Sequence, residues 1–217
     1  MADDIDLVIF DCDGVLVDSE VLSVEVDRRV LADFGWQLPI PEIVHRFVGR
    51  SAQHFRCELE AHLGHALPDD WEEPYQQWYL DAFEQHLMPV PGIERALDAL
   101  PGAACVASSG SHAKIRRNLA RTRLLDRFSE VIFSADDVRE GKPAPDLFLH
   151  AAASMNAVPE RCVVVEDSRF GIAAAHAAGM RSFGYAGGLT PAEWLRGPGT
   201  TVFNDMAQLP SLLGRAR

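Results

Sequence analysis

Lysine is almost missing from this sequence of 217 residues: there are only two, Lys114 and Lys142, against 18 arginines. Acidic residues outnumber basic ones by 32 to 20, which gives a formal net charge of −12 at pH 7. Nucleic acids and anionic membranes are bound through an extended positive field, which this composition does not offer. We therefore expect neither partner, although a small phosphorylated molecule would need only a local cationic pocket.

The sequence also lacks C-x-x-C pairs and any apolar run close to the roughly 20 residues of a membrane-spanning helix. Three of its four cysteines lie in or beside apolar runs, which is typical of reduced thiols that pack as small hydrophobic groups. The acidic first residues fit neither a signal peptide nor a transit peptide. We expect a cytoplasmic protein, monomeric by default, with one large domain or a large and a small one.

Short apolar runs recur along the chain without strict alternation of apolar and polar residues. Such runs predict parallel strands that are buried on both faces, here at 5–10, 103–107, 131–133, 161–165, 181–185 and 201–203. Amphipathic patterns between them predict helices at 112–125, 145–155 and 170–178. Strands that alternate with helices indicate an α/β fold with a Rossmann-like, doubly wound parallel sheet.

The rhythm of strand and helix is interrupted once, between the first and the second predicted strand. That long stretch is rich in aromatic residues and reads as helical at 21–34, 41–47, 52–63 and 70–85. A Pro-Val-Pro-Gly segment at 89–92 closes it, and a further helix at 93–100 leads into the second strand. We therefore predict an α/β core domain, 1–17 and 89–217, with a small helical cap domain, 18–88, inserted after the first strand.

Four polar motifs follow predicted strands or the loops between them. They are Asp11-Cys-Asp13-Gly, Ser108-Ser109-Gly-Ser, Gly-Lys142-Pro-Ala-Pro-Asp and Glu166-Asp167-Ser. Open parallel sheets bind their ligands at the carboxyl ends of strands, where these motifs are expected to meet. Asp11 and Asp13 are two residues apart, so a strand end would point both carboxylates the same way, and their repulsion requires a cation.

Taken together, the four motifs are interpretable as a phosphoryl-transfer site. Three or four carboxylate oxygens with open positions for water suit Mg²⁺, which offsets the repulsion between an anionic nucleophile and a phosphate. A serine hydroxyl and a lysine ammonium could hold the phosphate oxygens while charge shifts. Each motif alone is more often a turn or a helix cap, so the prediction depends on all four occurring in order.

This motif set resembles the haloacid dehalogenase-like hydrolase superfamily, in the branch of β-phosphoglucomutase and small sugar phosphatases, over nearly the whole chain. The resemblance implies that Asp11 is the nucleophile and forms an aspartyl-phosphate. It implies that Asp13 is the general acid for the leaving alcohol and then the base that activates water. The other implied roles are phosphate binding by Ser108, Ser109 and Lys142, and Mg²⁺ coordination by Asp11, Asp13 through its carbonyl, Asp167, and Glu166 directly or through water.

Within the superfamily, the residues favour a phosphatase over a mutase. Dehalogenases lack a carboxylate at the position of Asp13, so phosphate monoesters are the expected substrates. The β-phosphoglucomutase pattern has a His, a Lys and an Arg where this chain has Ser23, Val48 and Ala52. A sugar-phosphate mutase of that type is the alternative hypothesis. A catalytically silent relative would have lost the nucleophile or the metal-binding acids, which this chain retains.

The likeness extends to bacterial sugar phosphatases, including those that act on 6-phosphogluconate, through Ser19-Glu20-Val and Arg46-Phe-x-Gly. We expect Glu20, Arg46 and Arg50 to be the cap residues that contact a phosphorylated sugar or sugar acid. Lys114, in contrast, lies on an arginine-rich helix face, where we expect another cation to serve as well.

Overall fold

The computed structural model describes residues 5–50, 52–100 and 102–215, which fold as two compact units. One unit comprises the chain up to Asp18 together with the chain from Met88 onward, and the other is Ser19–Leu87. In the described part of the first unit, six strands form one parallel sheet in the order β3-β2-β1-β4-β5-β6. The strands are β1 Leu7–Phe10, β2 Ala103–Ser108, β3 Ile132–Ser134, β4 Cys162–Glu166, β5 Arg181–Tyr185 and β6 Thr200–Phe203.

The central strands owe their position to apolar side chains on both faces. Every residue of β1 and of β4 is buried. Ile9 of β1 pairs with Cys105 of β2 on one side and with Val164 of β4 on the other. The six predicted strands and the doubly wound parallel sheet are thus confirmed. The sequence signal was clear because near-continuous apolar runs are tolerated only where helices cover both faces of a sheet.

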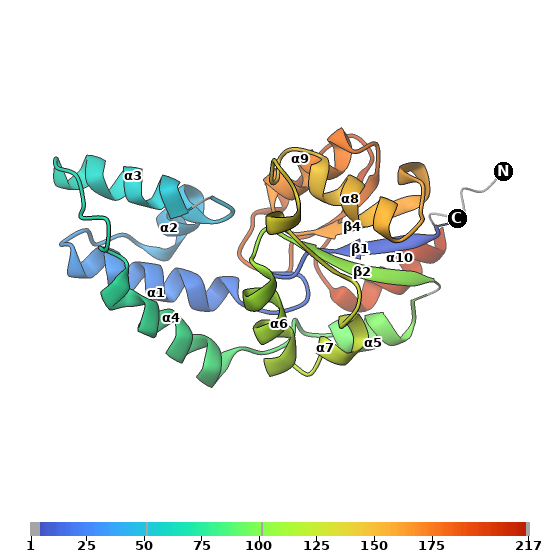
Figure 1. Cartoon of the computed structure of the whole chain (residues 1–217), viewed down its shortest axis with the longest axis horizontal. Helices are drawn as coiled ribbons and strands as arrows, with labels where there is room; N and C mark the ends of the chain where they lie inside the picture. Colours follow the sequence, from blue (N-terminus) through green and yellow to red (C-terminus); the bar gives the residue numbers. More distant parts are fainter. Residues whose placement is uncertain (1–4, 51, 101, 216–217) are drawn as a thin grey trace. The chain divides into compact units, whose positions relative to one another are not determined.

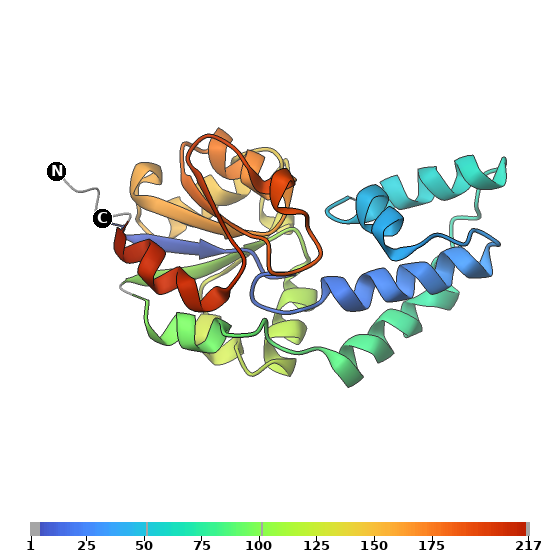
Figure 2. The same cartoon turned by 180° about the vertical axis from the view of Figure 1, so that it is seen from behind.

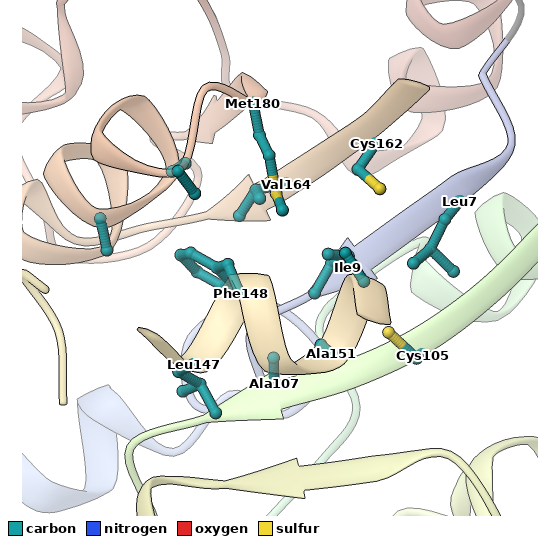
Figure 3. Close-up of a cluster of buried hydrophobic side chains, with 14 residues drawn as sticks. Leu7, Ile9, Cys105, Ala107, Leu147, Phe148, Ala151, Cys162, Val164 and Met180 are labelled. Atoms are coloured by element: carbon teal, nitrogen blue, oxygen red, sulfur yellow. The ribbon is translucent and has the colours of Figure 1, made fainter. Parts of the chain in front are cut away.

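Helices cover the two faces of the sheet, with α8 and α9 on one and α5, α6, α7 and α10 on the other (Figures 1 and 2). Their bounds are α5 Ile93–Asp98, α6 His112–Arg121, α7 Leu125–Phe128, α8 Asp146–Ser154, α9 Arg169–Ala177 and α10 Leu209–Arg215. Phe148 of α8 lies beside Ile9 and Val164, and all three side chains are fully buried (Figure 3). This apolar layer packs α8 against β1 and β4, whose register is set by the backbone pairing of the strands.

The helix predicted over 112–125 is in fact two helices. The first ends at Arg121, and Arg123 adopts a left-handed backbone with φ of 61° before α7 begins at Leu125. Leu119 and Leu124 are both fully buried, so the apolar pattern continues across a break in the backbone. The prediction was wrong here because apolar spacing reports burial and not helical continuity.

The second unit is helical, as predicted, and is built around aromatic side chains. Its helices are α1 Glu20–Asp33, α2 Ile40–Phe47, α3 Ala52–Leu63 and α4 Glu73–His86. The Phe55 ring lies 4.7 Å from that of Phe47 and stacks on that of Trp71 at 5.9 Å. No helix in the described residues of either unit is long and apolar enough to cross a membrane.

Helices α1 and α4 are joined by two tyrosine–carboxylate hydrogen bonds. Tyr75 donates to Asp33 over 2.5 Å, and Tyr79 donates to Asp27. Burial raises the pKa of Asp27 from its usual 3.8 to about 6, although the bond from Tyr79 opposes this shift. Between these two pH values the folded protein binds more protons than the unfolded chain. The contribution of Asp27 to stability is therefore lost as the pH rises through this window, and stays lost above it.

We expect Asp27→Asn to stabilise the protein at pH 7.5 and to have a smaller effect at pH 4, because asparagine accepts the same hydrogen bond without a buried charge. A shift of about two pKa units corresponds to at most about 3 kcal/mol. The measurement is the difference in thermal midpoint between variant and wild type at the two pH values.

Glu25→Gln is the matched control on the same helix. A hydrogen bond from Arg28 lowers the pKa of Glu25, so neutralising it should have the opposite sign at pH 7.5. A midpoint difference for Asp27→Asn that is the same at both pH values would contradict the prediction.

Candidate active site

The candidate site lies at the carboxyl ends of β2, β1 and β4, the three strands at the centre of the sheet. Asp11 directly follows β1, and its backbone N–H still bonds to the carbonyl of Val165 at 3.0 Å. Ser108 ends β2 and Glu166 ends β4. Because these strands are adjacent and parallel, motifs that are far apart in the sequence meet at one edge of the sheet.

Lys142 is the buried cation of this site. Its ammonium lies 2.5 Å from Asp11 Oδ1, 2.7 Å from Glu166 Oε1 and 3.1 Å from the carbonyl oxygen of Ala107. The side chain is only 4 % exposed. An ammonium has three N–H donors, and each has an acceptor here, so the surroundings match a tetrahedral donor and not the planar fork of arginine.

Two glycines leave room for the acidic side chains that β4 contributes. A Cβ on Gly14, which has φ of 76°, would overlap the Asp167 carboxylate. Asp167 therefore lies against the backbone that follows Asp13. A Cβ on Gly171, in α9, would overlap the Glu166 carboxylate, which also accepts the backbone N–H of Ser168 at 2.7 Å.

Lys114 also reaches the first motif, which corrects the expectation that it is an ordinary surface cation. Its Nζ lies 2.7 Å from Asp13 Oδ2. One turn further along α6, Asn118 Nδ2 lies 3.4 Å from Asp13 Oδ1, and Asn118 is 1 % exposed. Both lysines of the sequence thus contact an aspartate of the first motif, one each.

The charges of the site do not balance among its own side chains. Four carboxylates, those of Asp11, Asp13, Glu166 and Asp167, face two lysines. Burial raises the pKa of Asp11, Lys142 opposes the shift, and Glu166 adds to it. Burial disfavours the ammonium of Lys142, yet its attraction to Asp11 and Glu166 prevails and raises its pKa above the usual value.

This donor set fits a divalent cation bound partly through backbone and water. Within residues 5–50, 52–100 and 102–215, no three His, Cys, Asp or Glu side chains form a ready-made metal cluster. Asp11, Asp167 and the backbone carbonyl of Asp13 carry hard oxygen atoms of the kind that would form part of such a coordination sphere. Mg²⁺ keeps several waters and accepts such incomplete protein sites, and its charge matches the excess of two carboxylates.

The two serines that we predicted for phosphate binding make fewer contacts than Lys142. Ser108 is buried, and its Oγ accepts the backbone N–H of Gly110 at 3.2 Å. Ser109 is exposed at the end of β2. Cys12, between the two aspartates, is buried, and burial raises its pKa well above the usual value, which argues against a role as a thiolate nucleophile.

The predicted cap residues belong to the second unit and are described within it. Glu20 is the first residue of α1, and Arg50 is exposed just after α2. Arg46 bonds to Glu42 at 2.8 Å and to Glu58 at 3.0 Å. The structure therefore gives Arg46 acidic neighbours within the cap itself.

The sequence interpretation missed Lys114 and Asn118. Lys114 follows the N-cap residue Ser111 by three positions, and Asn118 is one helical turn later. The signal available in the sequence was this polar pair at i and i+4, on the helix that directly follows the second motif.

Comparison with known proteins places this architecture in a family. A sequence model of the haloacid dehalogenase-like hydrolases matches residues 5–179. The chain is 31% identical over 209 residues to 6-phosphogluconate phosphatase of Escherichia coli, covering 96% of this chain and 94% of that protein. The chain therefore belongs to the haloacid dehalogenase-like hydrolases, and the predicted membership is confirmed.

Solved structures of the family share the fold. A haloacid dehalogenase-like protein of unknown function from Agrobacterium tumefaciens superimposes with a TM-score of 0.88 at 35% identity, covering 97% of this chain and 98% of that one. A putative β-phosphoglucomutase from Thermotoga maritima gives a TM-score of 0.79 at 27% identity, covering 97% and 99%. The likeness extends over both units of the chain.

We expect Lys142→Arg to lower kcat by about 100-fold or more, because a planar guanidinium cannot meet three acceptors arranged around an ammonium. Steady-state phosphate release tests this, with circular dichroism to verify the fold. Arg139→Lys, an exposed change three residues earlier, is the control and should keep wild-type rates. Wild-type kcat in Lys142→Arg would remove Lys142 from the reaction.

Proposed function

We propose that this chain is a Mg²⁺-dependent phosphatase that hydrolyses a small phosphorylated sugar or sugar acid through an aspartyl-phosphate on Asp11. The observation that supports it is the pairing of two aspartates with two lysines at the end of β1. Asp11 is held by buried Lys142, and Asp13, two residues later, is held by Lys114. One carboxylate is thus placed against a buried cation, as a nucleophile requires, and the other stands beside it to transfer protons.

In the proposed first step, a carboxylate oxygen of Asp11 forms a bond to phosphorus as the bond from phosphorus to the leaving oxygen breaks. Asp13 supplies the proton that the departing alkoxide needs. Lys142, already in contact with Asp11, also compensates negative charge on the phosphoryl oxygens. Ser108 and Ser109, at the end of β2, are the proposed hydroxyl contacts for those oxygens.

In the second step, water attacks the phosphorus of the aspartyl-phosphate, and Asp13 accepts the proton that the water loses. The acyl-phosphate bond breaks, which releases inorganic phosphate and restores the carboxylate of Asp11. Asp13 thus regains the proton that it gave up in the first step, and the two steps together consume one water for each phosphate ester.

Asp11, the carbonyl of Asp13 and Asp167 are the residues that would hold Mg²⁺. The ion would supply positive charge that screens the nucleophile from the phosphate dianion. Glu166 is placed differently, because its carboxylate already accepts from Lys142 and from the Ser168 backbone. We assign Glu166 to orienting Lys142 and to any contact with the metal that passes through water.

The sugar-acid part of the proposal rests on the likeness to the Escherichia coli 6-phosphogluconate phosphatase. Glu20, Arg46 and Arg50 remain the cap residues that we propose for recognising the substrate beyond its phosphate. A mutase of the β-phosphoglucomutase type is the second candidate, favoured by the likeness to the Thermotoga maritima structure. Ser23, Val48 and Ala52 differ from the mutase pattern, and hydrolysis needs no second phosphate-binding orientation.

The test is a phosphate-release screen over sugar, sugar-acid and polyol phosphates with Mg²⁺ present. We expect net phosphate release from one or a few of them, with 6-phosphogluconate among those hydrolysed. Asp11→Asn should reduce turnover by at least about 1,000-fold without loss of the fold, because the amide cannot form the phosphoenzyme. Isomerisation of a monophosphate in the presence of a bisphosphate, without phosphate release, would favour the mutase. Undiminished turnover in Asp11→Asn would overturn the mechanism.

A further inference from the structure

The side chain of Asp13 is held at both of its carboxylate oxygens by residues of a single helix. Lys114 Nζ donates to Oδ2 at 2.7 Å, and Asn118 Nδ2 lies 3.4 Å from Oδ1. Both donors project from α6, which follows the second motif in the sequence and packs against the sheet. Asp13 itself belongs to the loop after β1, so the two contacts connect elements about 100 residues apart.

The sequence around the start of α6 builds this arrangement. Ser111 caps the helix and accepts the backbone N–H of Lys114, which sets the first turn. Asn118 follows at i+4, so both side chains lie on the same helix face. The Lys114 stem runs past Gly110, where a Cβ would lie 3.3 Å from Lys114 Cδ. Any larger residue at position 110 would press on the path of the lysine.

Burial separates the two contacts from an ordinary surface ion pair. Asn118 is 1 % exposed; its Nδ2 donates to Asp13, whereas its Oδ1, also buried, has no hydrogen-bond partner among the described residues. Lys114 is partly buried, with 39 % of its side chain exposed. Its ammonium lies 2.7 Å from Asp13 Oδ2, so a charged donor contacts the carboxylate directly. The pair therefore constrains Asp13 and is not merely adjacent to it.

We propose that Lys114 and Asn118 are positioning residues, which fix the orientation of the Asp13 carboxylate for proton transfer to the leaving oxygen. An aspartate has two side-chain torsions, and donors at both oxygens remove the freedom of each. Neither residue takes the proton itself. The inference rests on the proposed role of Asp13 as general acid and goes beyond it, because it names the groups on which that role depends.

A leaving-group comparison distinguishes positioning from other roles of a lysine near a phosphate site. A sugar phosphate leaves as a basic alkoxide and needs a proton in the transition state, whereas p-nitrophenolate leaves readily without one. Loss of a group that orients the acid should therefore reduce kcat/KM much more for the sugar phosphate. Loss of a group that binds the phosphate, or that only stabilises the fold, should reduce both alike.

The experiment compares Lys114→Met and Asn118→Leu with wild type on p-nitrophenyl phosphate and on the best sugar phosphate of the screen. We expect kcat/KM for the sugar phosphate to fall by about 10- to 100-fold, a fraction of what general acids contribute, and that for the aryl ester by less than about threefold. Lys114→Arg, which keeps a charged donor, should restore part of the loss. Arg117→Met, an exposed change on the same helix, is the control and should match wild type.

Asp13→Asn sets the reference pattern and separates the two levels of the proposal. If Asp13→Asn shows the selective loss but the α6 variants lose activity equally on both esters, or not at all, then positioning is overturned while the role of Asp13 stands. If Asp13→Asn itself shows no dependence on the leaving group, the acid role and the positioning role are both overturned. Thermal midpoints of all variants identify any loss that reflects unfolding.

Discussion

The contact between buried Lys142 and its three acceptors is the interaction on which the site depends. Parallel strands that end side by side bring Asp11, Glu166 and the Ala107 carbonyl to one point, where three oxygens would repel each other without a cation. A buried charge of this kind is tolerated only when it is paired and fully hydrogen-bonded. The ammonium satisfies both conditions, and it explains why a chain that uses arginine 18 times has lysine at this position.

The packing of the acidic side chains also explains why two positions of the site are glycine. Gly14 and Gly171 stand where a methyl group would displace the carboxylate of Asp167 or of Glu166. Each glycine thus leaves room for one acid at the carboxyl end of β4, and one of these acids, Glu166, is a partner of Lys142. Ser108 and Glu166 end strands of the sheet, whereas Asp11, Asp13, Lys142 and Asp167 lie in the loops that follow strands or connect them.

Much of the fold and of the candidate site could be predicted from the sequence. The residues that could not be predicted were missed for one physical reason. The strands, Asp11, Asp13 and Lys142 carry local signals, because apolar runs mark the strands and the motifs follow them. Lys114 and Asn118 carry only a helical spacing, and which aspartate that helix face meets is decided by how α6 packs on the sheet. The acidic partners of Arg46 were partly readable, since Glu42 lies at i−4 on the same helix. Ion pairs that are open to solvent contribute little, so they would not prevent Arg46 from binding a stronger anion.

The negative charge of the site explains why two lysines, and not a single one, contact the first motif. Four carboxylates and two lysines leave an excess of two negative charges before any substrate is present. A phosphate dianion would double that excess. In the proposed mechanism a divalent cation would offset half of the total, and a proton on Asp13 would remove one more charge close to the leaving group. Without Lys114 the excess of negative charge at Asp13 would be larger, and its Oδ2 would lose this donor. The scarcity of lysine in this chain is therefore informative, because each of its two lysines contacts one aspartate of the same motif.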